Sequence, residues 1–445
     1  MATWNNHIKD TLSLSYPVII GQLGFIMMGV VDTMMVGGLG AIPLAAASVA
    51  NSLFILILII GIGISYAVTP LVSIAAGAKK LDDCGTIFRN SWLVNVLTGI
   101  ILFLITYFGS SLIPYLNQAH SVAGQASSYT KILGISIIPA MLFQTYKQFI
   151  EGLSIVRPAM VVTIVANIIN GFGNWILIYG KFGLPAMGLD GAGWATFLSR
   201  LFMGLVLMYY VSHSRRFKHY GLSLHFKDIR QDIIKKILNL GLPSAFQYIF
   251  EVGAFSFAVI MVGWLGTKQL AAHQIAMNLA SISFMATLGI SSAGGIRVGN
   301  AVGRQDVSEV RKSGYTAIFL GASFMASCGV VFVFLRNFLP SLYISDPEVI
   351  AIASNLLLIA AVFQISDGTQ AVGIGILRGL TDVKGPTVIT FIAYWVLALP
   401  IGYFLGFTLN MQVVGVWIGL LIGLSASATM LTLRFNKKSR RLIEV

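Results

Sequence analysis

The most regular feature of the sequence is a series of long apolar segments separated by short polar ones. Most segments are close to the roughly 20 residues that an α-helix needs to cross a hydrocarbon core about 30 Å thick. The pattern therefore predicts twelve transmembrane helices. The segments cover residues 14–36, 49–75, 93–116, 129–149, 159–179, 192–211, 240–265, 276–298, 315–338, 350–374, 387–407 and 413–433.

One polar interruption, at residues 212–236, is much longer than the others and is rich in basic residues. It divides the apolar segments into two groups of six. We therefore expect an N-lobe at residues 1–211, a cytoplasmic linker at 212–236 and a C-lobe at 237–445. The predicted fold class is an all-α membrane protein of two six-helix bundles.

Composition supports a membrane environment. Of the 445 residues, 56% are hydrophobic and 10% are charged, whereas roughly 25% of residues are charged in a typical soluble domain. The two cysteines, Cys84 and Cys328, are far apart in the sequence and predict neither a disulfide framework nor a metal site. No small-residue cleavage site follows the first apolar segment, so we expect no cleaved signal peptide.

The distribution of basic residues predicts the orientation. With the N-terminus in the cytoplasm, 25 of the 29 Lys and Arg residues are assigned to the cytoplasmic side, and Arg200, which lies inside the sixth apolar segment, is counted among them. The positive-inside rule then places both termini in the cytoplasm. The net charge of +13 is thereby explained by membrane topology, and we expect no nucleic acid partner.

The two groups of helices resemble each other in sequence. When residues 14–77 are aligned with residues 240–303, 19 of the 64 positions are identical, and Pro17 falls on Pro243. Because each copy contains an even number of helices, both copies insert in the same orientation, and their pseudo-two-fold axis lies along the membrane normal. Two similar bundles around a cleft can expose it to alternate sides by rocking, which favours a solute carrier over a channel.

Three carboxylates interrupt the apolar segments. Asp32 lies in the first, Glu251 in the seventh and Asp367 in the tenth, beside a glycine that can open the helix backbone. Charge in the membrane is costly, so each is a candidate functional residue. Carboxylates bind H⁺ and supply the oxygen ligands that hard cations prefer. A purely structural hydrogen-bonding role remains the alternative for each.

The repeat does not duplicate these carboxylates. Asp32 aligns with Ala258, and Glu251 aligns with Phe25. The two halves therefore share a scaffold and differ in their charged sites. We expect the function to lie where the two copies differ.

Several neutral polar residues are expected near these carboxylates. Asn170 and Asn174 are four residues apart and share a helix face, and Thr196 lies in the next segment. Ordinary hydrogen bonding between membrane helices is the alternative role for all three. Further candidates for the lining of a cleft are polar or soft side chains that also occur in ordinary membrane helices, namely Gln22, Met28, Gln247, Asn278, Phe363 and Gln364.

The sequence contains no phosphate-binding loop, dinucleotide-binding fingerprint, zinc-ligand spacing or nucleophile elbow. We therefore expect no cofactor, no ATP-driven pumping and no enzymatic activity. A membrane-embedded enzyme would need a paired nucleophile and base, or a metal cluster, and neither is evident.

Taken together, the motifs resemble those of a known family. The segments VDTMMVGGLGAIPLAAASVA with Asp32, EGLSIVRPAM, AAHQIA and SDGTQAVGIGILRGLTDVKGP with Asp367, together with Glu251, are similar to those of multidrug and toxic compound extrusion (MATE) transporters of the bacterial NorM-like branch. The resemblance covers nearly the whole chain. It implies two six-helix lobes arranged as a V in a bacterial cytoplasmic membrane. It also implies antiport of amphipathic compounds and organic cations in exchange for Na⁺ or H⁺, by a protein that functions as a monomer.

The resemblance also implies roles for the candidate residues. Glu251 and Asp367 would form a cation site in the C-lobe, and Asp32, Asn170, Asn174 and Thr196 would form a cation or substrate site in the N-lobe. Na⁺ would bind at Glu251 and Asp367 or at Asp32. Some members have a tyrosine one helical turn before the acidic residue of the tenth helix, whereas this chain has Phe363 and lacks that hydroxyl ligand.

A lipid or lipid-linked sugar flippase of related fold is the alternative function. Such a protein would need basic residues in its cleft to bind phosphate, whereas the candidates in the middle of the predicted helices are mostly acidic. The physiological substrate, the coupling ion and the stoichiometry are not predicted by the sequence.

Overall fold

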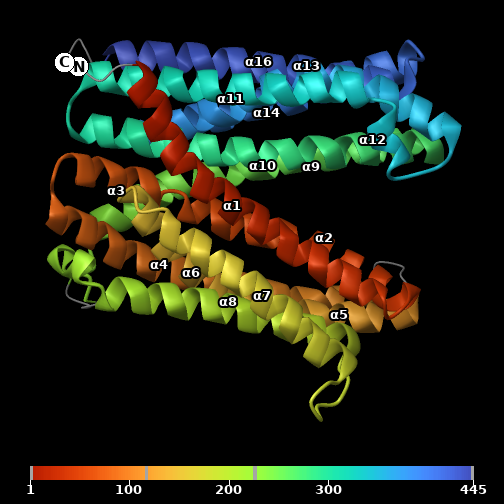
Figure 1. The fold of residues 1–445 in the computed structure, drawn as a ribbon, viewed down its shortest axis with the longest axis horizontal. Helices are drawn as coiled ribbons and strands as arrows, with labels where there is room; N and C mark the ends of the chain where they lie inside the picture. Colours follow the sequence, from red (N-terminus) through yellow and green to blue (C-terminus); the bar gives the residue numbers. More distant parts are fainter. Residues whose placement is uncertain (1–3, 116–118, 224–227, 442–445) are drawn as a thin grey trace. The chain divides into compact units, whose positions relative to one another are not determined.

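The computed structural model of the chain describes residues 4–115, 119–223 and 228–441. Within these residues the chain is almost entirely helical and contains no strand (Figure 1). Twelve helical spans are long and apolar enough to cross a bilayer, so the predicted number of crossings is confirmed. The spans cover residues 4–37, 41–77, 81–115, 120–152, 157–179, 188–213, 231–265, 267–303, 307–335, 347–379, 384–408 and 412–441.

The helices pack into two compact units. The N unit comprises Ile20–Ala245, and the C unit comprises Met1–Ile19 together with Phe246–Val445. Both boundaries fall inside helices, in α1 (Trp4–Gly37) and α9 (Gln231–Leu265). The boundaries between the two units therefore differ from the boundary between the lobes expected from the sequence. That expected boundary was the linker at residues 212–236.

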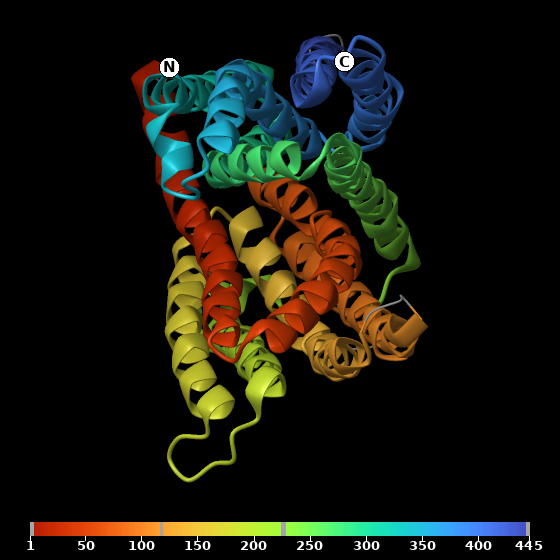
Figure 2. The ribbon, with the colours of Figure 1, turned by 90° about the vertical axis from the view of Figure 1, so that its right-hand side faces the viewer.

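The N unit also contains α2 to α8. In Figure 2, α7 and α8 lie side by side and are joined by the loop at residues 180–187. The bounds are α2 Ala41–Ser65, α3 Val68–Gly77, α4 Leu81–Gly109, η1 Ser110–Tyr115, α5 His120–Ile135, α6 Ile137–Gly152, α7 Arg157–Tyr179, α8 Gly188–His213 and η2 Arg215–Tyr220.

Two spans of the N unit are broken, although the apolar pattern predicted single helices there. The breaks separate α2 from α3 and α5 from α6. Each break follows from a proline, which has no backbone N–H to bond to the carbonyl four residues earlier. Pro70 leaves the Tyr66 carbonyl without this bond, and Pro139 does the same for the Ile135 carbonyl. The second break leaves Ser136 at the junction of α5 and α6.

The C unit is built around α13, which packs against α10, α11 and α16. The glycine beside Asp367 could have opened the backbone, but α13 is helical from Pro347 to Gly379. Gly368 instead permits close packing, since a Cβ there would lie 3.1 Å from the Gly321 carbonyl oxygen of α11. The bounds are α10 Thr267–Gly303, α11 Val307–Leu335, α12 Phe338–Ser341, α13 Pro347–Gly379 and α16 Gln412–Arg441.

The eleventh span has wider helical turns. Two π-helical stretches flank α15, and Pro400, which cannot donate a backbone hydrogen bond, lies at the start of α15. α16 packs along this span, and both are blue in Figure 2. The bounds are α14 Lys384–Phe391, η4 Ile392–Ala398, α15 Leu399–Tyr403 and η5 Phe404–Thr408.

The repeat found in the sequence recurs in the backbone. Gly40 and Gly266 occupy equivalent positions before α2 and α10, with φ of +114° and +125°. Lys79 and Gln305 are likewise equivalent, and their φ values are 57° and 58°. Positive φ is uncommon for residues other than glycine, so its occurrence at matched positions shows that the two copies share a backbone conformation.

The start of α1 belongs to the C unit and the start of α9 belongs to the N unit, although the rest of each helix belongs to the other unit. The two helix starts pack at equivalent positions. In the N unit, a Cβ on Gly63 of α2 would lie 2.8 Å from the Ala245 nitrogen of α9. In the C unit, a Cβ on Gly289 of α10 would lie 2.9 Å from the Ile19 nitrogen of α1. Gly63 aligns with Gly289, and Ile19 aligns with Ala245. Each unit is therefore completed by the start of a helix that continues into the other unit.

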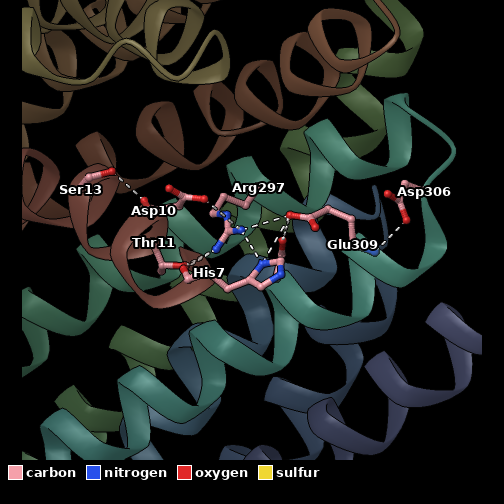
Figure 3. A network of polar contacts seen from close by, with 8 residues as sticks. His7, Asp10, Thr11, Ser13, Arg297, Asp306 and Glu309 are labelled. Atoms are coloured by element: carbon pink, nitrogen blue, oxygen red, sulfur yellow. Dashed lines mark hydrogen bonds and ion pairs between the residues drawn. The ribbon is translucent and has the colours of Figure 1, made fainter. Parts of the chain in front are cut away.

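A polar network anchors the start of α1 in the C unit (Figure 3). Arg297 of α10 donates from Nη1 to the His7 carbonyl oxygen at 2.6 Å and to Thr11 Oγ1 at 2.7 Å. Its Nη2 donates to Glu309 Oε1 of α11 at 3.1 Å and lies 3.9 Å from Asp10 Oδ2. The buried guanidinium is thus paired and hydrogen-bonded, as a buried charge requires.

Candidate functional site

The first acidic cluster lies in the N unit around Asp32 of α1, whose side chain is 7% exposed. Asn174 of α7 donates from Nδ2 to Asp32 Oδ1 at 2.6 Å. Thr196 of α8 donates from Oγ1 to Asp32 Oδ2 at 2.8 Å. Both carboxylate oxygens therefore accept a hydrogen bond from a neutral side chain, and three helices meet at this residue.

Asn170 completes this cluster from one turn earlier on α7. Its Oδ1 accepts from Asn174 Nδ2 at 3.4 Å, and its Nδ2 lies 3.5 Å from Thr196 Oγ1. Both asparagines are fully buried because their shared helix face points towards α1 and α8. The structure thus brings together all four residues that the sequence assigns to the N-lobe site. Asn174 Oδ1 is buried and has no hydrogen-bond partner among the described residues.

A pocket of about 460 Å³ opens beside Asp32. Its wall is mostly apolar and aromatic, and includes Phe54 and Tyr129. Met28 and Thr196 also line it, whereas Asn170 and Asn174 lie behind the carboxylate. An apolar pocket with a few polar groups is typical of a small-molecule binding site.

The second acidic cluster lies in the C unit. Glu251 of α9 and Asp367 of α13 are both buried and lie within electrostatic range of each other. Gln370 of α13 donates from Nε2 to Glu251 Oε1 at 3.3 Å, and Gln247 is a second hydrogen-bond partner of Glu251. Asp367 receives no hydrogen bond from the described residues, and Glu251 is the charged neighbour that acts on it.

A tyrosine hydroxyl that the sequence did not identify reaches this cluster. Tyr394 of the eleventh span accepts from Gln370 Nε2 at 2.8 Å and lies within electrostatic range of both carboxylates. Phe363, the residue at the expected tyrosine position, is buried and packs against Trp417 at a ring-centroid distance of 5.6 Å. The C unit therefore has a phenol hydroxyl at its acidic cluster, contributed by another helix.

The remaining predicted lining residues are dispersed. Gln22 is half-buried on α1 and does not line the Asp32 pocket. Gln364 is buried and donates to Ser283 Oγ, and Asn278 is exposed and accepts from the Tyr343 hydroxyl at 3.2 Å. Of the six candidates, Met28 lines the Asp32 pocket and Gln247 contacts Glu251.

Arg200 was counted among the cytoplasmic residues in the sequence, but its guanidinium lies inside the N unit. The side chain is 8% exposed, lines the Asp32 pocket, and donates from Nη1 to Ser136 Oγ at 2.7 Å. α8 continues to His213, so Arg200 lies more than three turns from its end. The apolar segment at residues 192–211 already contained Arg200, and the packing of α8 against α5 and α6 places its guanidinium in the interior.

The described residues contain no group of three or more His, Cys, Asp or Glu side chains arranged to hold a metal ion. The oxygen donors at each acidic cluster are instead one or two carboxylates with amide and hydroxyl oxygens. Such donors suit a hard monovalent cation or a proton rather than a tightly held transition metal.

The sequence profile of the MatE family matches residues 17–176 and 243–404 of this chain. These two matches together cover most of the chain, and their starts coincide with Pro17 and Pro243, the prolines that align in the internal repeat. The same profile therefore recognises both copies of the repeat.

Curated relatives match over nearly the full length. A probable multidrug resistance protein NorM from Mesorhizobium japonicum is 35% identical over 98% of this chain and 95% of its own length. The multidrug resistance protein NorM of Photobacterium profundum is 34% identical over 98% and 96%. The multidrug resistance protein MdtK of Yersinia pseudotuberculosis is 35% identical over 96% and 95%.

Solved structures show the same fold. The eukaryotic MATE transporter AtDTX14 aligns with a TM-score of 0.88 at 22% identity over 99% of both chains. A MOP superfamily transporter from Pyrococcus furiosus aligns with a TM-score of 0.86 at 20% identity, over 99% of this chain and 97% of its own.

Proposed function

The chain belongs to the MatE family of membrane transporters, and we propose that it is a multidrug efflux antiporter that exports amphipathic compounds and organic cations in exchange for Na⁺ or H⁺. The observation that carries the proposal is the presence of two acidic clusters, one beside a pocket in the N unit and one formed by two buried carboxylates in the C unit. In this proposal the N unit holds the cargo, and the C unit holds the coupling ion.

The C-unit cluster has the properties of a cation site. Glu251 and Asp367 are both buried and lie within electrostatic range of each other. Two nearby carboxylates repel each other when both are ionised, which costs free energy. A proton or Na⁺ bound between them removes that repulsion. Gln370, Gln247 and Tyr394 then supply neutral oxygens around the ion.

The N-unit cluster has the properties of a cargo site. Asp32 is fixed on both oxygens by Asn174 and Thr196 and faces an apolar pocket. An organic cation that enters this pocket gains apolar contact with its wall and Coulombic attraction to the carboxylate, which is strong in a medium of low dielectric constant. Asp32 is also a possible second site for the coupling ion, which would then compete with cargo for one carboxylate.

The orientation of the chain and the membrane in which it lies are part of the proposal. The excess of Lys and Arg in the loops supports a cytoplasmic location for both termini. Full-length similarity to NorM and MdtK proteins supports the cytoplasmic membrane of a bacterium. A single chain contains both clusters, which supports function as a monomer.

The proposal is tested with the purified chain in liposomes loaded with a fluorescent organic cation. Efflux is measured under an imposed Na⁺ gradient, an imposed pH gradient, and neither. We expect at least one gradient to accelerate efflux, and the Asp367→Asn variant to lose that acceleration. The Glu348→Gln variant alters an exposed carboxylate that pairs with Lys268 and serves as the control.

Efflux that ignores both gradients would contradict antiport. Full gradient dependence in Asp367→Asn and in Glu251→Gln would contradict the assignment of the coupling ion to the C unit while leaving antiport intact. The two parts of the proposal can therefore fail separately.

A further inference from the structure

Arg200 of α8 is a buried cation that the proposed function does not use. Its side chain lines the pocket beside Asp32. The guanidinium lies over the Phe54 ring, with its central carbon 5.0 Å from the ring centroid. Within the described residues its single hydrogen bond is to Ser136 Oγ, and its Nε is buried without a partner. Because arginine has five N–H donors, this position leaves most of them without an acceptor from the described residues.

The spacing along α8 brings this cation within reach of Asp32. Thr196, which donates to Asp32 Oδ2 at 2.8 Å, precedes Arg200 by four residues. Residues four apart on a helix are neighbours on one face, with about 5–6 Å between their Cβ atoms. The arginine side chain is long enough to span this distance, and the two charges lie within electrostatic range of each other. Rotation of the Arg200 side chain therefore suffices to bring the guanidinium to the carboxylate.

Asp32 has room for the guanidinium without losing its own partners. Asn174 and Thr196 each donate one hydrogen bond to it, whereas an ionised carboxylate has about four acceptor sites. Arginine binds carboxylates through two parallel N–H donors. Unpaired charge in the membrane interior is costly, so this pairing lowers the cost of both groups. The pocket wall thus offers the guanidinium two positions, one at Asp32 and one at Ser136, where the Phe54 ring also attracts a cation.

We propose that Arg200 is an internal competitor for Asp32, whose guanidinium moves between Ser136 and the carboxylate and excludes organic cations when it pairs with Asp32. This inference rests on the proposed binding of organic cations at Asp32 and adds the residue that releases them. A cation that binds the carboxylate displaces the guanidinium to Ser136, and the returning guanidinium displaces the cation. The apparent affinity for cargo falls with the fraction of protein in which Arg200 occupies Asp32.

The test measures binding of tetraphenylphosphonium to the purified full-length protein by equilibrium dialysis, so that the result does not depend on transport. In Arg200→Gln we expect about tenfold tighter binding, because a neutral amide does not pair with Asp32 as a cation does. Triphenylphosphine oxide, an uncharged compound that also carries phenyl rings, should bind equally to the unaltered protein and the variant. Its binding reports that the apolar wall is intact.

The variant Ser136→Ala shows whether the guanidinium moves. It removes one of the two positions but keeps the charge, so we expect Arg200 to occupy Asp32 more often and tetraphenylphosphonium to bind about fivefold more weakly. In an Asp32→Asn background the same substitution should change binding by less than about twofold. Ser199→Ala is the matched control, because Ser199 is fully buried beside Arg200 but donates to the Ala195 carbonyl of its own helix.

Unchanged or weaker binding of tetraphenylphosphonium in Arg200→Gln would overturn the proposal. Unchanged or tighter binding in Ser136→Ala would overturn it too, since a guanidinium that stays in place and only repels cations does not weaken binding when it loses a partner. Equal weakening in Ser199→Ala would have the same consequence. If Arg200→Gln does not fold or loses triphenylphosphine oxide binding, Ser136→Ala decides, because it keeps both charges.

Failure of this inference is distinguishable from failure of the proposed function. If the two variants do not change binding as expected but gradient-driven efflux of the fluorescent cation persists, the internal competitor is wrong and export stands. If binding follows the expected pattern but no gradient drives efflux, the competitor stands and antiport is wrong.

Discussion

The acidic clusters of the two units differ in how their carboxylates are stabilised. In the N unit, both oxygens of Asp32 accept a hydrogen bond, and a pocket of about 460 Å³ lies beside them. In the C unit, Asp367 receives no hydrogen bond from the described residues and lies near a second carboxylate, Glu251. A carboxylate held by neutral donors remains in place when a ligand leaves, whereas a carboxylate pair in which one member, Asp367, receives no donor is stabilised by a bound ion. This difference supports the proposal that the N unit binds the cargo and the C unit binds the coupling ion.

The largest effect is expected at the C unit. In Asp367→Asn we expect gradient-driven efflux to fall about a hundredfold, because one neutral amide removes the charge that binds the coupling ion. Binding of cationic cargo to the purified variant should change less than about twofold. The measurement is efflux from liposomes together with equilibrium binding. A matched loss of cargo binding would show that the two clusters do not have separate roles.

The next effect is expected at Asp32. The Asp32→Asn variant should weaken binding of an organic cation by about tenfold, since the pocket loses its negative charge but keeps its apolar wall. Residual transport should retain its dependence on the ion gradient. The control is Asp190→Asn, which alters a partly buried carboxylate of α8 that accepts from Ser128 at 2.8 Å. If ion dependence disappears with Asp32, the N unit also binds the coupling ion.

A smaller effect tests how Asp32 is held. Thr196→Val keeps the shape of the side chain but removes the donor to Asp32 Oδ2, a charge-assisted bond worth about 1.5–3 kcal/mol. Because one donor remains at Asn174, we expect cation binding to weaken by about fivefold rather than to be lost. Thr130→Val is the matched control, since Thr130 donates to the Ala126 carbonyl of its own helix. Equal effects of both substitutions would indicate general destabilisation.

The smallest effect is expected at Tyr394. In Tyr394→Phe, the C-unit cluster loses the hydroxyl that bonds to Gln370, an interaction of about 1 kcal/mol. We expect the ion concentration for half-maximal efflux to rise by about threefold to fivefold, with cargo binding unchanged. Tyr343→Phe, which alters an exposed tyrosine bonded to Asn278, is the control. No change in Tyr394→Phe would mean that this hydroxyl does not replace the one absent at Phe363.

Features that depend on local pattern could be predicted from the sequence. The apolar segments gave the twelve spans, and the spacing of Asn170 and Asn174 gave their shared face towards Asp32. The predicted roles of these residues in transport stay predictions. The breaks at Pro70 and Pro139 carried a signal in the sequence, because proline prevents the helical bond four residues back.

Features that depend on which helices pack together could not be predicted in this way. Tyr394 reaches Gln370 from a different span, and nothing near Tyr394 in the sequence marks that contact. Arg200 was counted with the cytoplasmic residues although it lies inside the sixth apolar segment, and its guanidinium is buried where α8 packs against α5 and α6. The exchange of the starts of α1 and α9 likewise depends on packing against glycines far away in the chain.

This exchange has a consequence for biosynthesis. The ribosome produces the start of α1 first, but its packing partner Gly289 follows some 270 residues later. At roughly 5–20 residues per second, the first helix therefore waits on the order of tens of seconds before the C unit can form around it. The N unit, in turn, is complete only when Ala245 has been made. The two units therefore cannot fold to completion one after the other during synthesis. A fragment that ends in the linker at residues 212–236 would contain neither unit in full.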